Sequence, residues 1–236
     1  MLRYKRVLIK LSGEALAGEN QRGIDYNTVV SICSEIKQIS EMGGEVAIVV
    51  GGGNFWRGRD NLQMERTRAD HMGMLATVIN SLAIGDALEQ LGVQVRVMTA
   101  LPMQQVAEPY IRGRALRHLE KGRVIVLACG TGNPFFSTDT ASALRAAEIS
   151  AEIIFKATLV DGVYDRDPLK YPDAVKYTTL SFSDILNNEL EVIDSTAASM
   201  CRDTKIPVMV FDLYHDPHNL VRAICGEEIG TIIKDH

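Results

Sequence analysis

The chain has 236 residues, of which 46% are hydrophobic and 23% charged, a composition typical of globular proteins and unlike that of disordered or fibrous chains. Its formal net charge of −5, with no Lys/Arg run longer than two, argues against a nucleic-acid-binding surface. No apolar run approaches the ~18 residues of a membrane span, and the N-terminal segment lacks a secretory signal, so we expect a cytoplasmic protein that binds neither nucleic acid nor a membrane.

Short β-branched runs alternate with segments of helical periodicity as far as about residue 157. The runs are apolar on both faces, as in buried parallel strands. Between them, residues 25–42 and 70–91 carry apolar residues at helical spacing. This rhythm predicts an α/β fold with three layers, in which helices cover both faces of a central, mostly parallel sheet. The expected strands are residues 6–11, 45–50, 93–98, 123–128 and 152–157.

The stretch 70–91 places Met72, Leu75, Ile79, Leu82 and Leu91 on one stripe. A stripe of this kind packs either on the sheet or on another subunit. The helix is apolar enough to support a subunit interface, although one sequence does not prove one.

The last third of the chain differs in character. ATLVDGVYDRDP, residues 157–168, contains Asp161-Gly162 between two short β-like pieces, which predicts a tight hairpin. No long linker or repeat interrupts the chain, so we predict a single domain over residues 1–236 with a somewhat distinct part from about residue 151. The elements expected here are helices at 182–189 and 195–204, a strand at 207–212, a helix from about Pro217 and a terminal strand at 231–235.

A lysine interrupts the first apolar strand. Lys10 lies in VLIKLSGEAL, followed by Ser12 and Gly13. At the carboxyl end of a buried parallel strand, it would point into the crevice where open α/β sheets bind ligands. The alternative is an edge-strand lysine whose long stem reaches solvent. Lys156 lies in the same way near the end of the strand EIIFKA. Two lysines at such positions make the edge-strand explanation weaker than it would be for one.

A run of glycines follows the second strand. EVAIVV leads into Gly51, Gly52 and Gly53, and Arg57 follows shortly after. Glycines allow unusual dihedral angles or the close approach of a ligand, and successive unshielded N–H groups bind anions. We interpret the run as a phosphate site, with a plain glycine-rich turn as the alternative.

A third polar loop follows the fourth strand. ACGTGNPFFSTDTAS, residues 128–142, contains Ser137, Thr138 and Asp139 ahead of a helical segment. These residue types cap helix N-termini, where phosphates bind. Asp139 could instead only balance the helix dipole, and Asp194 is most simply the N-cap of the helix that begins near Ser195.

Three such loops at one sheet edge exceed the needs of a single phosphate. They suit two phosphorylated ligands placed end to end, as in phosphoryl transfer. The chain has no Gly-Lys dipeptide, so the P-loop motif is excluded and the phosphates need another arrangement. The four cysteines lack a C-x-x-C pair, so we expect them to be reduced residues of the core. The histidines show no convincing set of metal ligands, so the sequence leaves any metal site unknown.

Five segments, in order, resemble the amino acid kinase family and, within it, the bacterial uridylate kinases. They are VLIKLSGEAL, VVGGGNFWRG, ADHMGMLAT, GTGNPFFSTDTA and ATLVDGVYDRDP. The resemblance covers about Lys5 to Ile233. It implies an enzyme that transfers the γ-phosphate of ATP to UMP with Mg²⁺, forming UDP and ADP in pyrimidine biosynthesis. It also implies a homohexamer built as a trimer of dimers, with GTP as an activator and UTP as an inhibitor.

The resemblance also implies roles for particular residues, with an acceptor-binding N-terminal part and a donor-binding part from about 151 to 236. The implied catalytic group is Lys10, Lys156, Asp139 and Asp194. The implied ATP-binding residues are Lys10, Leu11, Ser12, Gly13, Gly53, Arg57, Thr158, Tyr164 and Asp167. The implied UMP-binding residues are Gly52, Asp70, Thr131, Gly132, Asn133, Pro134, Phe135, Phe136, Ser137 and Thr138. The implied regulatory segment is Gly18, Glu19, Asn20, Gln21, Arg22 and Gly23.

Some positions depart from the family pattern, and two other functions remain open at this stage. Cys129 replaces a common glycine, and Leu159 replaces a commonly polar residue beside the donor site. One alternative keeps the fold but phosphorylates a carboxylate or carbamate, against which Phe135 and Phe136 argue. The other is a nucleotide sensor without catalysis, against which the intact Lys10, Asp139 and Asp194 argue.

Overall fold

A computed structural model describes residues 1–20, 22–57, 63–166, 168, 170–187, 190 and 192–235. Within them, nine strands form one sheet in the order β4-β3-β5-β2-β1-β6-β10-β11-β9. All neighbouring strands pair in parallel except β10 and β11. The strands are β1 (Arg6–Leu11), β2 (Glu45–Val50), β3 (Val95–Thr99), β4 (Glu108–Pro109), β5 (Val124–Ala128), β6 (Ile153–Thr158), β9 (Thr179–Leu180), β10 (Val208–Asp212) and β11 (Thr231–Ile233).

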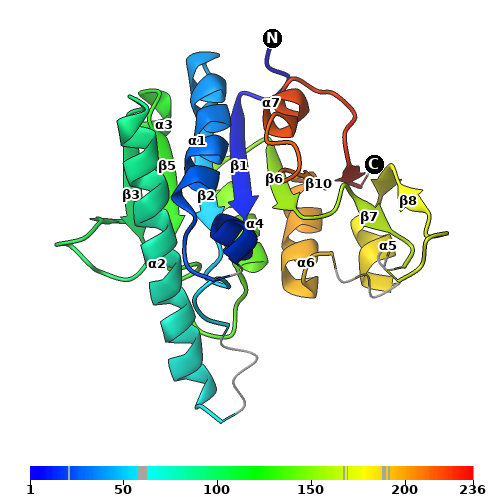
Figure 1. Cartoon of the computed structure of the whole chain (residues 1–236), viewed down its shortest axis with the longest axis horizontal. Helices are drawn as coiled ribbons and strands as arrows, with labels where there is room; N and C mark the ends of the chain where they lie inside the picture. The colour runs from blue at the N-terminus through cyan, green and yellow to red at the C-terminus, as the bar shows by residue number, and fades with distance from the viewer. Residues whose placement is uncertain are drawn as a thin grey trace.

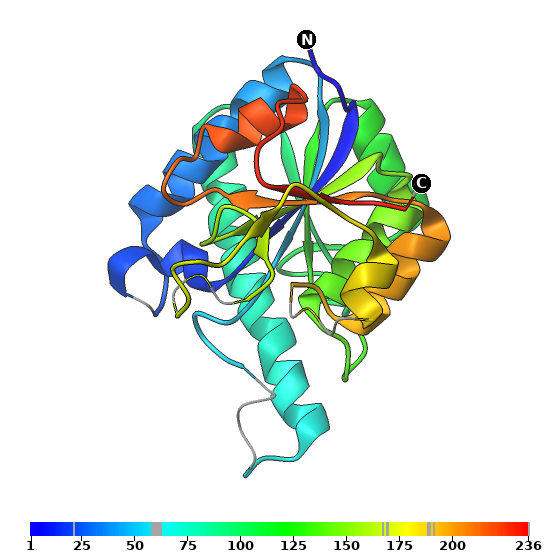
Figure 2. The same ribbon diagram turned by 90° about the vertical axis from the view of Figure 1, so that its right-hand side faces the viewer.

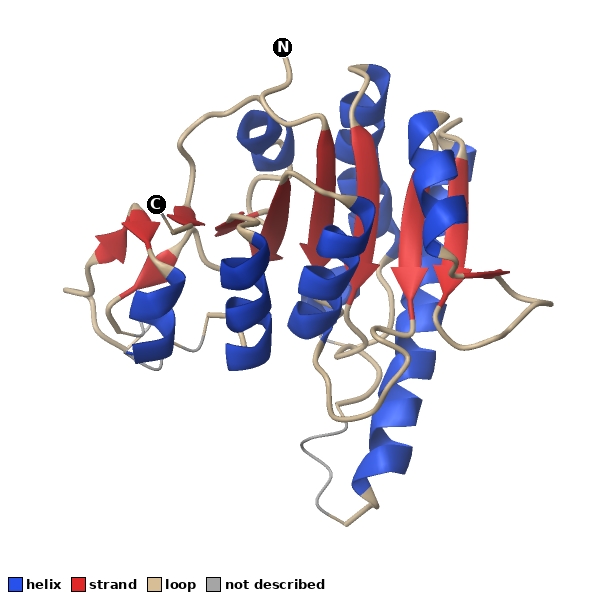
Figure 3. Ribbon diagram, turned by 180° about the vertical axis from the view of Figure 1, so that it is seen from behind, coloured by secondary structure: helices blue, strands red, loops and turns tan. Residues whose placement is uncertain are grey.

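Helices cover both faces of this sheet (Figures 1 and 2). One apolar core contains buried side chains of α1, α2 and α7; the other contains those of α3, α4, α5 and α6, which lie in front in Figure 3. The expected three-layer α/β architecture is therefore confirmed. The helices are η1 (Glu14–Asn20, a 3₁₀ segment), α1 (Tyr26–Glu41), α2 (Arg66–Gln90), α3 (Arg112–Glu120), α4 (Thr138–Ile149), α5 (Phe182–Asn187), α6 (Ser195–Thr204) and α7 (Asn219–Ile224).

The central strand β1 lies between β2 and β6. After β1 the chain builds the sheet outward on the β2 side, and then returns to place β6 on the other side of β1. The strand order thus reverses between β1 and β6, and ligands of open α/β sheets bind at such a reversal, beyond the carboxyl ends of the strands. The two strands that carry Lys10 and Lys156 are the two that flank it.

The two long helices begin at side-chain caps that the local sequence supplies. The Asp25 carboxylate accepts a hydrogen bond from the N–H of Asn27 at the start of α1, and Glu65 accepts from Thr67 and Arg68 at the start of α2. α2 therefore begins earlier than the predicted residue 70, and it extends well beyond the carboxyl ends of the strands (Figure 1).

Four of the five residues predicted for the apolar stripe on α2 face outward, whereas Leu91, the C-cap of the helix, packs partly buried against the core. Met72, Leu75, Ile79 and Leu82 are 38–47% exposed. The side of α2 that packs on the sheet instead presents small and buried residues, among them Ala69, Ala76, Ala87 and Gly85. An amphipathic helix normally buries such a stripe, so the stripe remains available for another surface.

The predicted hairpin at Asp161-Gly162 is wrong. β6 stays in the central sheet, while β7 (Val163–Tyr164) leaves it to pair antiparallel with β8 (Lys176–Tyr177). A two-residue hairpin of this kind needs positive φ at its central residues, and neither of these two is among the residues with positive φ. Gly162 serves close packing instead, because a Cβ there would lie 2.7 Å from Thr231 Oγ1.

No helix in the described part of the chain combines the length and apolar character needed to cross a bilayer.

Candidate active site

Lys10 and Lys156 are register partners on the parallel strands β1 and β6. Side chains of register partners point to the same face of a sheet, so the two ammonium groups lie side by side at the strand-order reversal. Asp139, in the first turn of α4, lies between them: Lys10 Nζ is 3.0 Å from its Oδ1 and Lys156 Nζ is 2.5 Å from its Oδ2. All three side chains are 12–15% exposed, so the charges are shielded from bulk water yet open to a ligand.

The charges in this cluster shift the pKa values of its members. Burial alone would raise the pKa of the Asp139 carboxyl, but the charges of Lys10 and Lys156 outweigh burial and lower that pKa to about 2. Burial lowers the pKa of Lys156, and the charge of Asp139 opposes this effect. A carboxyl with so low a pKa is a poor proton acceptor at neutral pH. Asp139 is therefore placed to hold the two lysines and is poorly suited to act as a base.

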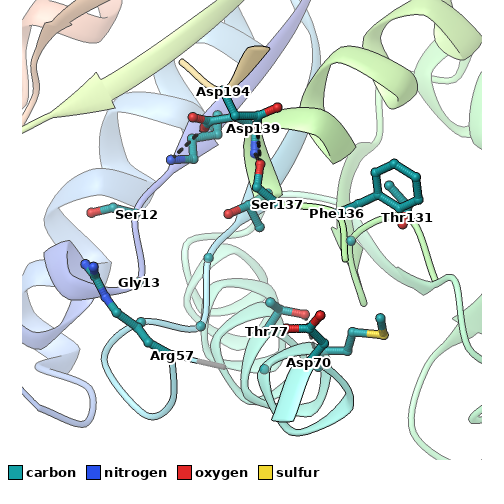
Figure 4. A pocket seen from close by; sticks show the side chains of 18 of the residues that line it. Ser12, Gly13, Arg57, Asp70, Thr77, Thr131, Phe136, Ser137, Asp139 and Asp194 are labelled. Atoms are coloured by element: carbon teal, nitrogen blue, oxygen red, sulfur yellow. Dashed lines mark hydrogen bonds and ion pairs between the residues drawn. The ribbon is translucent and has the colours of Figure 1, made fainter. Parts of the chain in front are cut away.

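Asp194 is the N-cap of α6, which confirms the simpler of the two interpretations of this residue. Its carboxylate accepts from the N–H of Ala197 at 2.9 Å and from Thr140 Oγ1 at 2.9 Å, and Ser137 Oγ donates to it as well. These bonds join α6 to the first turn of α4. Asp194 thus lies beside Asp139 at the same side of the cleft (Figure 4).

The glycine turn after β2 packs closely on two neighbours. None of Gly51, Gly52 and Gly53 has a positive φ, so the need for unusual dihedral angles is excluded. A Cβ on Gly52 would lie 2.8 Å from Gly73 O in α2, and a Cβ on Gly13 would lie 2.6 Å from Gly53 N. The glycines therefore allow the turns after β1 and β2 to lie against each other, with their backbone groups along the cleft.

The loop between β5 and α4 bends back on itself through several left-handed residues. Cys129, Gly130, Gly132 and Phe135 have φ of 64, 56, 83 and 72°. Cys129 stands where the family resemblance predicts glycine, and its φ accounts for that prediction, since a side chain in this conformation costs roughly 1–2 kcal/mol. The loop ends at Ser137, whose Oγ accepts from the N–H groups of Asp139 and Thr140 and so begins α4.

This loop carries two exposed aromatic rings shortly before α4 begins. Phe135 and Phe136 are 65% and 52% exposed. The N–H of Phe135 donates to Asp70 Oδ2 at 2.8 Å, and the guanidinium of Arg66, paired with Asp70, lies 5.7 Å from the Phe135 ring. Exposed rings beside fixed polar groups can stack on a planar base.

These elements enclose one cleft of about 1200 Å³. Arg57, in an ion pair with Glu14, and Phe136 lie on opposite sides of it in Figure 4. The cleft brings together the predicted residues Lys10, Ser12, Gly13, Gly52, Gly53, Arg57, Asp70, Thr131, Asn133, Phe135, Phe136, Ser137, Thr138, Asp139, Lys156 and Asp194.

Other predicted residues do not line this cleft. The Leu11 side chain is fully buried in the core under α1 and α2, because alternate residues of β1 face opposite sides of the sheet. Thr158 and Tyr164 are not among the lining residues, and their hydroxyls donate to Val160 O and to Asp161 Oδ1. Gly132, Pro134 and the described part of the segment 18–23 also lie outside it, and Asp167 and Gln21 fall outside the described residues.

The structure also reveals functional candidates in and near the cleft that sequence reasoning missed. Thr77 Oγ1 accepts from the N–H of Cys129 at 2.8 Å and fixes the start of the polar loop. Arg66 lies four residues before Asp70, a helical ion-pair spacing that could have revealed it. Arg145, behind the cleft, donates to Gly130 O at 3.1 Å and stacks on Tyr110; no local pattern indicates these contacts, since the partners lie far along the chain.

The described residues contain no group of three or more His, Cys, Asp and Glu side chains placed to hold a metal ion. Both oxygens of Asp139 face lysines, and Asp194 accepts bonds from α4 and α6. A cation in this cleft would therefore be coordinated mainly by oxygen atoms of a molecule bound there, rather than by protein carboxylates.

Comparisons with known proteins agree with this geometry. Residues 5–212 match the model of the family described as "Amino acid kinase family". The chain is similar to a solved UMP kinase from Bacillus anthracis, with 40% identity, a TM-score of 0.94, and coverage of 98% of this chain and 96% of that one. A UMP kinase from Ureaplasma parvum shows 36% identity and a TM-score of 0.91 over 99% and 100% of the two chains. A uridylate kinase from Archaeoglobus fulgidus shows 29% identity and a TM-score of 0.73 over 96% and 99%.

Replacing Asp139 by Asn should lower the free energy of unfolding at pH 6, because two partly buried lysines lose their common counterion. The folded pKa of Asp139, about 2, lies below the ordinary value of 3.8. Its stabilisation is therefore complete above pH ~4, amounts to about 2 kcal/mol, and is lost as the pH falls through the folded value. The deficit of Asp139→Asn, measured by urea unfolding from pH 6 to pH 3, should shrink toward the acid end. Asp203→Asn, at an exposed carboxylate, is the control; a deficit independent of pH would contradict the assignment.

Proposed function

Because the chain belongs to the amino acid kinase family, we propose that its cleft transfers the γ-phosphate of ATP to UMP, giving UDP and ADP. The observation that carries this proposal is the Lys10–Asp139–Lys156 cluster, placed between the glycine turn and the Phe135-Phe136 loop. The related UMP kinase structures, similar over nearly the whole chain, support the same substrate and reaction.

The reaction calls mainly for neutralisation of charge. A donor triphosphate and an acceptor monophosphate bring roughly six negative charges into one cleft of a protein whose net charge is −5. Lys10 and Lys156 would lie where charge develops on the moving phosphoryl group, beside the first turn of α4, which carries Asp139. Their ion pairs with Asp139 hold both ammonium groups in position before a nucleotide binds.

The acceptor needs no general base. The second pKa of a phosphate monoester is near ~6, so the attacking oxygen of UMP is already ionised at neutral pH. The pKa of Asp139, about 2, agrees with the absence of a general base, because this carboxylate, which pairs with both lysines, is not suited to take up a proton. Direct in-line transfer follows, without a phosphorylated enzyme intermediate.

The two substrates divide the cleft between them. UMP would lie on the side of Gly52, Asp70 and the loop 131–138, with its base against the exposed rings. ATP would extend its phosphates along Ser12, Gly13, Gly53 and Arg57 toward the part of the chain from about 151. Thr158, Tyr164 and Asp167 remain predictions for the nucleoside of ATP.

Mg²⁺ would enter with ATP and supply Lewis-acid stabilisation of the phosphate charge. The carboxylates of Asp139 and Asp194 would orient the lysines or help to hold such an ion. Regulation by GTP and UTP, and the role of residues 18–23 in it, remain predictions from the family resemblance.

An acceptor screen tests the proposed function. ADP release from ATP and Mg²⁺ would be measured with UMP, CMP, aspartate, N-acetylglutamate and carbamate. We expect UMP to be the preferred acceptor, with UDP as the product. Turnover of a carboxylate or carbamate in place of UMP, or UMP binding without UDP formation, would overturn the proposal.

Replacing Lys10 by Ala should reduce kcat by about 10²–10⁴-fold, because a preorganised charge is removed from the transition state. The variant should still fold, since Asp139 keeps its bond to Lys156. Single-turnover UDP formation gives the measurement, and circular dichroism checks the fold. Lys37→Ala, at a half-exposed lysine on α1, should keep its activity; near wild-type activity of Lys10→Ala would refute the role.

A homohexamer, built as a trimer of dimers, is proposed for the assembly, and the outward stripe of α2 is the surface that supports it. Four large apolar side chains at helical spacing are exposed on one helix, which a stable isolated subunit would not normally leave in water. The stripe lies on the opposite side of α2 from the residues that pack on the sheet, so a second copy can cover it without disturbing the core.

Replacing Ile79 by Glu should shift the assembly to a smaller species, because a charge would be buried in the contact. Light scattering after size exclusion measures the mass. Val175→Glu makes the same kind of change at another exposed apolar site and should leave the mass unchanged. An unchanged mass for Ile79→Glu would exclude the stripe as a subunit contact.

A further inference from the structure

Two buried amides lie beneath the glycine turn. Asn54 and Asn80 are 3% and 0% exposed. They bond to each other in both directions: Asn54 Nδ2 donates to Asn80 Oδ1 at 2.9 Å, and Asn80 Nδ2 donates to Asn54 Oδ1 at 2.7 Å. Neither residue was singled out as functional by the sequence, and Asn80 does not line the cleft.

The second N–H of each amide holds a backbone carbonyl. Asn80 Nδ2 donates to Gly51 O at 2.7 Å, and Asn54 Nδ2 donates to Gly23 O at 2.6 Å. All four amide hydrogens of the pair thus have an acceptor, which is the condition under which a buried polar network is rigid and stabilising. The pair links three segments that are distant in sequence: the glycine turn, helix α2 and the turn at Gly23.

The pair also borders the other phosphate turn. A Cβ on Gly13 would lie only 2.6 Å from Asn54 Oδ1. The turn after β1 therefore rests on Asn54, while the turn after β2 is held through Gly51 by Asn80. A displacement of either amide would move the backbone groups that face the phosphates.

We propose that Asn80 is a positioning residue for nucleotide binding: from helix α2 it holds Gly51 and Asn54, and through them both phosphate turns. The inference rests on the proposed function for the identity of the ligands, but not for the geometry. An amide is required because one side chain must donate to two acceptors and accept from a third group at the same time.

Two variants of similar size remove these bonds in different ways. Asn80→Leu removes both donors. Asn80→Asp keeps the shape, but its carboxylate would face the oxygens of Gly51 and Asn54, and only its protonated form can donate to one of them. Burial and these neighbouring oxygens should raise the pKa of this carboxyl.

The test measures KM and kcat for ATP and UMP between pH 5.5 and 8.5, well below the unfolding temperature of each variant. We expect the KM values to rise about tenfold or more in Asn80→Leu, since an unpaired buried acceptor displaces the turn. In Asn80→Asp at pH 8.5 the rise should be similar, and it should be smaller at pH 5.5. Two charged groups near the turn are common to all variants, namely Glu14, which lies beside Gly53, and Arg57, which pairs with Glu14. Each variant is therefore compared with the wild type at the same pH.

Ser81→Ala is the matched control. Ser81 is a fully buried polar neighbour on α2 whose hydroxyl donates to Thr77 O within the same helix. It should lower the unfolding temperature without changing either KM. If both Asn80 variants behave in the same way, with lower stability and unchanged KM values, the positioning role is refuted. If Asn80→Leu does not fold, Asn80→Asp at pH 5.5 and 8.5 carries the test alone, and KM values equal to those of the wild type at both pH values refute the role.

A failure of the proposed function would look different. In that case the wild type itself would form no UDP from UMP. ATP affinity, measured by equilibrium dialysis, would then replace KM as the quantity compared between the wild type and the Asn80 variants.

Discussion

The ion pairs of one carboxylate with two lysines are the interaction on which the site depends. Parallel pairing of β1 and β6 places Lys10 and Lys156 in register on one face, where two unpaired ammonium groups would repel each other in a partly buried position. Asp139 stabilises the arrangement, because each of its two carboxylate oxygens forms an ion pair with one lysine. The same bonds attach α4 to the centre of the sheet, so the position of the helix and the position of the charges are set together.

Helix α4 then organises the rest of the cleft. Its N-terminus is capped by Ser137, and Ser137 and Thr140 bind the Asp194 carboxylate that begins α6. Further along α4, Arg145 holds a carbonyl of the loop that precedes the helix. The loop with the two exposed rings is thereby fixed from the helix side, while Asp70 on α2 holds it from the other side through the N–H of Phe135.

The opposite wall of the cleft depends on close packing rather than on charge. The turns after β1 and β2 approach so closely that side chains at Gly13 and Gly52 would collide with their neighbours, and the Asn54–Asn80 pair supports both turns from below. Phosphate binding by backbone groups requires that these groups be held before the ligand arrives, because any rearrangement would cost part of the binding energy. The buried amides and the glycines meet this requirement in different ways.

The sequence alone determined the alternation of strands and helices, the strand ends that carry Lys10, Lys156 and the glycines, and the loop that begins α4, because these features follow from local periodicity and from motifs that are contiguous in the chain. It did not determine that the strand after Asp161-Gly162 leaves the central sheet, since that turn is shaped by packing against Thr231. Nor did it determine that the Leu11 side chain points into the core. The stripe on α2 was visible as a pattern, but only the tertiary structure showed that it faces outward, because periodicity defines a face and not what covers it. The positions of Asp139 between two lysines and of Asn80 beneath Gly51 were decided by tertiary structure alone, since both join segments that are far apart in sequence.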